Sequence, residues 1–391
     1  MRHRELVDFA QGRQCRPKDR NAALLNGPRA IDGDPMKLAV LPGDDIGPEI
    51  VGAAMDILAV ANRVFGLQLS YDVQEVGMAA HRRRGTTLPE SVMKVVQEAD
   101  GVLLGPGGMT AYPPAREGGI NIPGTIRKRF ELFANIRPAR SRHGVPRALP
   151  GLDCVIVREN TEGFYADRNL HEGYGEFMPT ADVAISLRVI TAKASSRIAE
   201  TAFRIAATRR KRVTFVGKRH VLQVTDGLFW REVEAVASQH PDIELRELDV
   251  DAMAAEIYKC PQAFDVILTS NMFGDILSNL ASALAGSLGL ASALNIGERY
   301  AAANAGHGSA PDIAGRGIAN PVGIILSSAQ LLRWYGEKRC LGNYVAAANC
   351  IERAVDLSMS RPQTRTADLG GNATTKDVTA VICASVDTYG A

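Results

Sequence analysis

Three arginines near the middle of the chain are placed as ligands for a substrate that carries more than one carboxylate. Arg127 lies in the segment IRKR (126–129), Arg137 lies in ANIRP (134–138), and Arg158 directly follows the apolar run VIV (155–157). Ligands of α/β sheets bind at the carboxyl ends of the strands, and a guanidinium grips a carboxylate through two parallel hydrogen bonds. The set therefore predicts a di- or tricarboxylate substrate, although each arginine taken singly is more often a charge without such a role.

Acidic side chains lie on either side of another apolar run, DVILT (265–269). Asp251 belongs to VDAM (250–253), whereas Asp275 and Asn279 belong to NMFGDILSN (271–279) and are four residues apart, on one face of a helix. Asp275 follows the predicted strand, where a carboxylate suits a hard cation such as Mg²⁺ or Mn²⁺. The residues alone leave a second interpretation open, in which Asp275 caps a helix.

Two loops rich in small residues are candidates for binding a cofactor. The segment GHGSAPDIAG (306–315) has small side chains that let the backbone approach a flat cofactor. Its acid, Asp312, is of the kind that accepts a hydrogen bond from a ribose hydroxyl and repels an added phosphate. The segment GPGG (105–108) also follows a strand, but it lacks GxGxxG spacing, so a tight turn is preferred over a phosphate cradle.

The elements that must position these groups alternate along the chain. Apolar runs predict strands at 37–41, 101–105, 154–157, 212–216 and 265–269, and apolar periodicity predicts helices at 48–65, 195–207 and 228–238. This alternation predicts an α/β fold with a largely parallel sheet. The stretch 163–189 breaks the rhythm and ends in an alternating run at 182–188, and such an excursion is usually functional or used in oligomerisation.

Composition excludes several classes of protein. The net charge is only +2, which does not indicate a nucleic-acid or membrane surface, and no stretch approaches the roughly 18 apolar residues of a membrane helix. The six cysteines show neither a CxxC pair nor zinc-site spacing, so a reducing, cytoplasmic location is expected. Residues 1–35 are rich in arginine, have no apolar signal core and contain acids, so we expect a disordered or non-native extension ahead of Met36.

Taken together, the motifs resemble the isocitrate/3-isopropylmalate dehydrogenase family, the β-decarboxylating dehydrogenases. The resemblance covers essentially all of 36–391 and is carried, in order, by LPGDDIGPEI (41–50), FANIRPAR (133–140), VRENTEGFYAD (157–167), VTDGLF (224–229), NMFGDILSN (271–279) and HGSAPDIAGRGIANP (307–321). It implies a two-domain isopropylmalate-dehydrogenase-like fold. Residues 36–132 plus 286–391 would form a discontinuous, large cofactor-binding domain. Residues 133–285 would form a small domain with the metal and substrate residues and, after Gly163, an arm that clasps a second copy in a homodimer.

The resemblance also implies a role for each candidate residue. Arg127, Arg137 and Arg158 would hold the substrate carboxylates, Tyr165 would protonate the enol after CO₂ leaves, and Lys218 of the partner subunit would be the base at the 2-hydroxyl. Asp251 of the partner subunit would bind Mg²⁺ or Mn²⁺ together with Asp275 and Asn279. The implied NAD site comprises His307, Gly308, Ser309, Ala310, Asp312 and Asn320. The acid at Asp312 looks like a preference for NAD, because NADP-using relatives carry a basic residue there.

The chain departs from the family pattern at several positions. Asn279 replaces the usual aspartate, His220 replaces the usual asparagine after the lysine, and Asn304 replaces the usual acid before the cofactor loop. The substrate-selecting segment GINIPGT (119–125) is mostly apolar, which favours an uncharged C3 substituent and makes a 3-isopropylmalate-like substrate the leading hypothesis.

Isocitrate, homoisocitrate, D-malate and tartrate stay open as substrates. The segments NIG (295–297) and TDGLF (225–229) look more like the isocitrate/homoisocitrate branch. A different class of protein, a non-catalytic regulatory subunit of such an enzyme, is motivated by Asn279 and His220.

Overall fold

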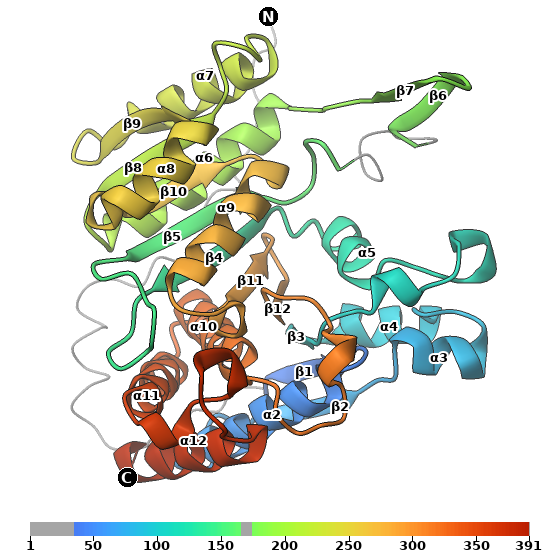
Figure 1. Cartoon of the computed structure of the whole chain (residues 1–391), viewed down its shortest axis with the longest axis vertical. Helices are drawn as coiled ribbons and strands as arrows, with labels where there is room; N and C mark the ends of the chain where they lie inside the picture. Colours follow the sequence, from blue (N-terminus) through green and yellow to red (C-terminus); the bar gives the residue numbers. More distant parts are fainter. Residues whose placement is uncertain (1–34, 166–173, 391) are drawn as a thin grey trace, which may run out of the picture.

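The computed structural model describes residues 35–165 and 174–390, and Figure 1 shows their arrangement. Residues 1–34, which make up almost all of the extension expected at 1–35, lie outside the described residues, as does the beginning of the predicted arm, 166–173. Within the described residues, no helix is long and apolar enough to cross a membrane.

One ten-stranded sheet runs through the molecule in the order β2-β1-β3-β12-β11-β4-β5-β10-β8-β9. Its strands are β1 (Lys37–Leu41), β2 (Ser70–Val73), β3 (Gly101–Leu104), β4 (Ala134–Arg140), β5 (Asp153–Glu159), β8 (Arg212–Gly217), β9 (Glu244–Asp249), β10 (Val266–Thr269), β11 (Ser292–Ile296) and β12 (Ala301–Ala305). The described helices are α2 (Gly47–Phe65), α3 (Gly77–Arg84), α4 (Glu90–Glu98), α5 (Ile122–Arg129), α6 (Ala192–Ala207), α7 (Thr225–Ala237), α8 (Val250–Lys259), α9 (Asn271–Leu284), α10 (Val322–Arg339), α11 (Gly342–Met359) and α12 (Thr375–Gly390).

Helices cover both faces of the sheet, so the mixed α/β fold that the sequence predicts is confirmed (Figure 1). Alternate residues of β5 pack against helices on opposite faces of the sheet. Val155 and Val157 belong to a core with α6 and α7, whereas Cys154 and Ile156 belong to a core with α8 and α9. At the other end of the sheet, α2, α10, α11 and α12 pack on one face and α4 and α5 on the opposite face. Inner strands such as β3, β5 and β10 therefore bury side chains on both faces, whereas the edge strands β2 and β9 do not.

The sheet is more mixed than the sequence predicts. Six neighbouring pairs are parallel, but the three central pairs, β12 with β11, β11 with β4, and β4 with β5, are antiparallel. β4 also contains Pro138, a residue that usually argues against a central strand. Because β11 pairs only with 134–136, the rest of β4 has β5 alone as a neighbour, and the missing N–H of proline is tolerated there.

The two halves of the sheet come from different parts of the chain. Residues 36–132 and 286–391 supply β2, β1, β3, β12 and β11, whereas 133–285 supplies β4, β5, β10, β8 and β9. The division into two domains at these boundaries stays a prediction.

A hairpin of β6 (Glu176–Thr180) and β7 (Val183–Ser186) projects away from the rest of the molecule (Figure 1). Its base is fixed by a bridge between Gly163 and Val189. All of its residues are exposed, including Phe177 and Met178. A two-stranded hairpin is marginally stable alone in water, so these apolar side chains suit a covering partner.

Candidate active site

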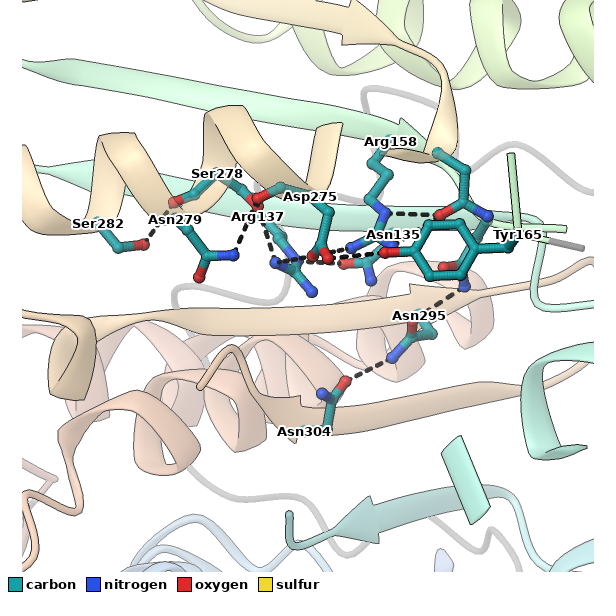
Figure 2. Close-up of polar contacts among 12 residues, drawn as sticks. Asn135, Arg137, Arg158, Tyr165, Asp275, Ser278, Asn279, Ser282, Asn295 and Asn304 are labelled. Atoms are coloured by element: carbon teal, nitrogen blue, oxygen red, sulfur yellow. Dashed lines mark hydrogen bonds and ion pairs between the residues drawn. The ribbon is translucent and has the colours of Figure 1, made fainter. Parts of the chain in front are cut away.

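Two of the predicted arginines converge on Asp275, as Figure 2 shows. Arg158 Nη1 contacts Asp275 Oδ1, and Arg137 Nη1 lies 3.2 Å from the same oxygen. Tyr165 donates a hydrogen bond of 2.8 Å from its hydroxyl to Asp275 Oδ2. The structure thus brings together four residues that are far apart in the sequence: a carboxylate, two guanidiniums and a phenol.

The pairing of β4 with β5 explains how the arginines meet. Asn135 lies opposite Arg158 in the antiparallel register, and Arg137 lies opposite Ile156, so all four side chains share one face of the sheet. α9 covers that face and carries Asp275. Gly274 permits the close approach, because a Cβ added there would lie 2.7 Å from Cβ and Cγ of Arg158.

The charged side chains of this cluster shift one another's pKa values. Burial raises the pKa of Asp275, but the charges of Arg158 and Arg137, with a smaller contribution from Arg127, outweigh burial and lower the pKa overall. Burial and the neighbouring Arg158 lower the pKa of Arg137 to about 10. For Tyr165, burial raises the pKa and Arg158 opposes the rise. The site is therefore an ionised, largely desolvated cluster with Arg127 on α5 near enough to contribute.

Several amides that support this cluster were not among the predicted site residues. Asn271 accepts hydrogen bonds from Nε and Nη2 of Arg158 at 2.9 and 2.7 Å, and Asn135 accepts one from Arg137 Nε at 3.2 Å. Asn271 lies within one of the motifs that carry the family resemblance, and that position is the signal in the sequence that could have identified it as a site residue. Separately from this cluster, Asn295 accepts from Asn160 at 3.0 Å and donates to Asn304 Oδ1 at 2.5 Å (Figure 2).

Lys218 and Asp251 occupy the carboxyl ends of β8 and β9. Lys218 Nζ contacts Asp251 Oδ1 and lies 3.2 Å from Asp249 Oδ2, and both interactions raise its pKa, the Asp251 hydrogen bond most strongly. His220 Nδ1 lies 3.1 Å from Asp249 Oδ2. Across 35–165 and 174–390, the side-chain contacts of Lys218 and Asp251 join them to each other and to Asp249, and none reaches Asp275.

The buried Asp226 fixes the backbone beside Lys218. Its Oδ2 accepts from the backbone N–H of Lys218 at 2.7 Å, and its Oδ1 accepts from Arg188 at 2.5 Å. The lysine backbone is therefore tied through Asp226 to the segment that follows β7, whereas its side chain is partly exposed.

Asp275 and Asn279, two of the predicted metal residues, are neighbours on α9. In the described part of the chain, no group of three His, Cys, Asp or Glu residues is arranged to hold a metal ion. Asn279 is exposed, and its Nδ2 donates to the carbonyl of Asp275 at 3.0 Å (Figure 2). That bond leaves the amide oxygen as the donor that a cation would use. The side-chain oxygens of Asp275 and Asn279 are of the type that a hard cation takes as ligands, and their role in metal binding stays a prediction.

The predicted cofactor residues lie in a loop between β12 and α10. Burial lowers the pKa of His307, so the ring is neutral near pH 7, and its Nδ1 lies 2.9 Å from the carbonyl of Gly308. Within the described residues, the buried Nε2 of His307 has no hydrogen-bond partner. Asp312 is exposed in a short 3₁₀ turn, Pro311–Ile313. A neutral ring whose Nδ1–H donates to a carbonyl leaves Nε2 as an acceptor, and the exposed carboxylate of Asp312 is a second acceptor in the same loop.

The remaining loop residues have structural contacts. Ser309 accepts from Ile46 N–H at 3.2 Å, Ala310 adopts a left-handed conformation with φ 45°, and a Cβ at Gly308 would meet open space. Asn320 is buried, accepts from Val322 N–H at 3.0 Å and donates to Asp368 at 3.0 Å. Its side chain is therefore committed to the start of α10, and a direct role for it in cofactor binding stays a prediction.

Glu49 holds this loop against α2, and it was not among the site residues predicted from the sequence. Its carboxylate accepts from the backbone N–H of Ala319 at 2.9 Å and of Gly317 at 3.3 Å, and it contacts the hydroxyl of Thr375. The motif LPGDDIGPEI (41–50) that contains Glu49 thus supports the loop. The GPGG segment is irregular and lies against the same motif, with Gly108 N–H donating to Asp44 at 3.0 Å.

Known proteins are similar to this chain in both sequence and fold. The family model described as isocitrate/isopropylmalate dehydrogenase matches residues 37–382. Isocitrate/homoisocitrate dehydrogenase of Thermus thermophilus is 42% identical over 88% of this chain and 97% of its own length. The 3-isopropylmalate dehydrogenase of Sulfurisphaera tokodaii is 39% identical over 87% and 96%.

A solved structure agrees with these sequence matches. The crystal structure of isocitrate dehydrogenase from Methylococcus capsulatus superimposes with a TM-score of 0.80 at 38% identity, covering 90% of this chain and 99% of that one. With a matching family model, relatives near 40% identity and a shared fold, the chain belongs to the isocitrate/isopropylmalate dehydrogenase family of decarboxylating dehydrogenases.

Proposed function

We propose that the protein catalyses the NAD-dependent, metal-requiring oxidative decarboxylation of a 3-substituted (2R)-malate, with 3-isopropylmalate as the leading substrate. The observation that carries the proposal is the convergence of Arg137, Arg158 and Tyr165 on Asp275. Two guanidiniums in one buried cluster match a substrate with two carboxylates. Arg127 on α5 is the third carboxylate ligand of this proposal, supported by its electrostatic effect on Asp275.

Each catalytic group has a separate task in this reaction. Tyr165 is the acid that protonates the enol carbon after CO₂ departs, and burial raises its pKa, so the phenol keeps its proton near neutral pH. Lys218 of the partner subunit is the base that removes the proton of the 2-hydroxyl. Because Asp251 and Asp249 raise its pKa, that role requires these carboxylate contacts to loosen when substrate binds.

The proposed metal ligands are Asp275 and Asn279 of one subunit and Asp251 of the partner subunit. A bound Mg²⁺ or Mn²⁺ would supply a positive charge that polarises the 2-oxygen and the developing enolate. The partial donor set in one chain supports a site shared between two chains, because Asp251 has no contact with Asp275 within the described residues.

A bound NAD would supply the oxidant for removal of the hydride from C2. His307, Gly308, Ser309, Ala310, Asp312 and Asn320 are its proposed binding residues. The exposed carboxylate of Asp312 favours a cofactor with a free ribose hydroxyl over one with a phosphate, since two negative charges would repel each other.

The second subunit in this proposal is another copy of the chain. The projecting hairpin with exposed Phe177 and Met178 supports a homodimer that covers these side chains. The proposed location is the cytoplasm, because the six cysteines of the sequence show neither a CxxC pair nor zinc-site spacing.

The substrate's C3 group is proposed from the segment 119–125. Thr87 pins this segment through hydrogen bonds with both backbone groups of Ile120, at 2.8 and 2.9 Å, and Asn121 accepts from Gly124 N–H at 2.9 Å. With the Asn121 carbonyl oxygen so engaged, the segment presents mostly apolar atoms and favours an uncharged substituent. Isocitrate or homoisocitrate is the second candidate, since the relative from Thermus thermophilus carries those names.

The test is NADH formation by the purified chain with Mn²⁺ and each of several 2R-hydroxy acids. The panel contains 3-isopropylmalate, isocitrate, homoisocitrate, D-malate and tartrate. Turnover that is strongest with 3-isopropylmalate is the expected result, whereas strongest turnover with isocitrate or homoisocitrate would move the assignment to the second candidate. A regulatory subunit, the remaining alternative, would show no turnover until a second, different chain is added.

A further inference from the structure

A cleft of about 630 Å³ lies at the amino ends of the inner strands β3 and β12, whereas the cofactor loop follows the carboxyl end of β12. Asp100 and Arg299 line it, and they come just before the first residues of β3 and β12. These two strands are parallel, and their carboxyl ends lead instead to the GPGG turn and to His307. The cleft is therefore separated from the proposed active site by the length of the strands.

The wall of the cleft carries more positive than negative charge. Its acids are already paired, because Asp100 binds Arg339 at 2.8 Å and Glu98 lies 3.6 Å from Lys37. The other cations of the wall are Lys94, Arg299 and Lys338. Of the ion pairs formed by residues 35–165 and 174–390, none involves any of these three cations.

Two of these cations are crowded on the same side of the cleft. Lys338 Nζ contacts the carbonyl of Glu298, lies 3.4 Å from the carbonyl of Arg299, and is 4.8 Å from the centre of the Trp334 ring. Burial lowers the pKa of Lys338, the charges of Arg339 and Arg299 add to this effect, and the charge of Glu298 opposes it without reversing it. An anion placed between Lys338 and Arg299 would relieve this repulsion.

The aromatic rings of the wall already stack against cations. Lys338 lies over Trp334 and Arg299 lies over Tyr300, 5.3 Å from the ring centre. A ring face that already holds a cation in this way orients that charge. The rings alone therefore do not predict that an aromatic ligand binds in the cleft. What the wall of the cleft lacks is negative charge to balance its cations.

We propose that this cleft is a binding site for a small, multiply charged oxyanion, held by Lys94, Arg299 and Lys338. Polyphosphates and polycarboxylates share this chemistry, since both present several anionic oxygens to ammonium and guanidinium groups. The site is independent of the proposed catalytic reaction, because it uses none of the residues around Asp275 or His307.

Trp334 makes the site directly observable. The chain has two tryptophans, so Trp230→Phe leaves Trp334 in the wall of the cleft as the sole reporter. We expect tripolyphosphate, titrated without divalent cations and at constant ionic strength, to change Trp334 fluorescence saturably. Adding Arg299→Gln and Lys338→Gln should raise the apparent Kd by at least about tenfold. Citrate in a parallel titration distinguishes polycarboxylates from polyphosphates.

The matched control is Arg353→Gln with Lys376→Gln, which removes the same charge from exposed positions on α11 and α12. This control should keep the Kd of the parent. Calorimetric titration of the unmodified chain and of the cleft variant, both with the two tryptophans, provides a second measurement if the fluorescence variant folds poorly. An equal Kd in the cleft variant and its parent, or no saturable binding of either anion at millimolar concentration, would overturn the proposal.

Discussion

Replacing Glu162 by glutamine should stabilise the protein at alkaline pH and leave it nearly unchanged at acid pH. Glu162 is buried, accepts hydrogen bonds from the N–H and hydroxyl of Thr191 at 2.8 and 2.9 Å, and lies near the buried Glu159. Burial, followed by the charge of Glu159, raises its pKa from 4.5 to about 7. A glutamine amide can accept from the N–H and donate to the hydroxyl, so both contacts are retained.

The sign and size of the effect follow from linkage. Between pH 4.5 and about 7 the folded protein binds this proton more tightly than the unfolded chain, so stability falls as pH rises through that window. One pKa unit corresponds to about 1.4 kcal/mol, and solvent screening at a partly accessible carboxylate reduces the full shift to roughly 1–2 kcal/mol. Glutamine carries no charge at any pH and avoids this cost.

The measurement is urea unfolding of the wild type and Glu162→Gln at pH 5 and pH 8, at one protein concentration. The difference in unfolding free energy between the two proteins should grow by roughly 1–2 kcal/mol in favour of the variant at pH 8. Glu200→Gln, an exposed change on the adjoining α6, is the control. A difference that is the same at both pH values, or that grows equally in the control, would refute the argument that burial destabilises the ionised Glu162.

Three further predictions test the proposed active site. Lys218→Met should abolish turnover while the dimer persists in size-exclusion chromatography, and a near-normal kcat would remove Lys218 from the role of base. Asn279→Asp should tighten Mn²⁺ binding severalfold by adding a charge, whereas an unchanged metal Kd would place position 279 outside the coordination sphere. Gly274→Ala puts a methyl group 2.7 Å from Cβ and Cγ of Arg158 and should lower kcat/KM by about 100-fold with an unchanged circular dichroism spectrum. An unchanged kcat/KM would mean that turnover does not depend on the exact position of Arg158.

The sequence predicts the strands with strong apolar runs and misses those without them. β1 occupies the predicted residues 37–41, and β5 and β8 extend the predicted runs by one to three residues. By contrast, β12 has the sequence AAANA, whose alanines have low strand propensity, and is a strand because β3 and β11 pair with it on both sides. Pairing of this kind is a tertiary effect that a local pattern does not contain.

The same distinction applies to the site. Arg158 is predictable as a ligand because it ends an apolar strand, and its neighbour Asn271 lies in a recognised motif. That Arg137 also reaches Asp275 depends on the register of β4 against β5 and on α9 lying over that face, which joins residues 138 positions apart. Spacing along the chain does not encode this contact, and the family resemblance predicted only that both residues belong to one site.

The position of β12 between β3 and β11 also has a consequence for synthesis on the ribosome. Half of the sheet is built from the first and last parts of the described chain, and α12 packs against α2, so β1, β2 and β3 emerge long before the strand and helix that cover them. The other half comes from the uninterrupted stretch 133–285, and we expect it to fold first during translation. A chain that stops early would leave the edge of β3 unpaired, and such an edge invites association with other chains.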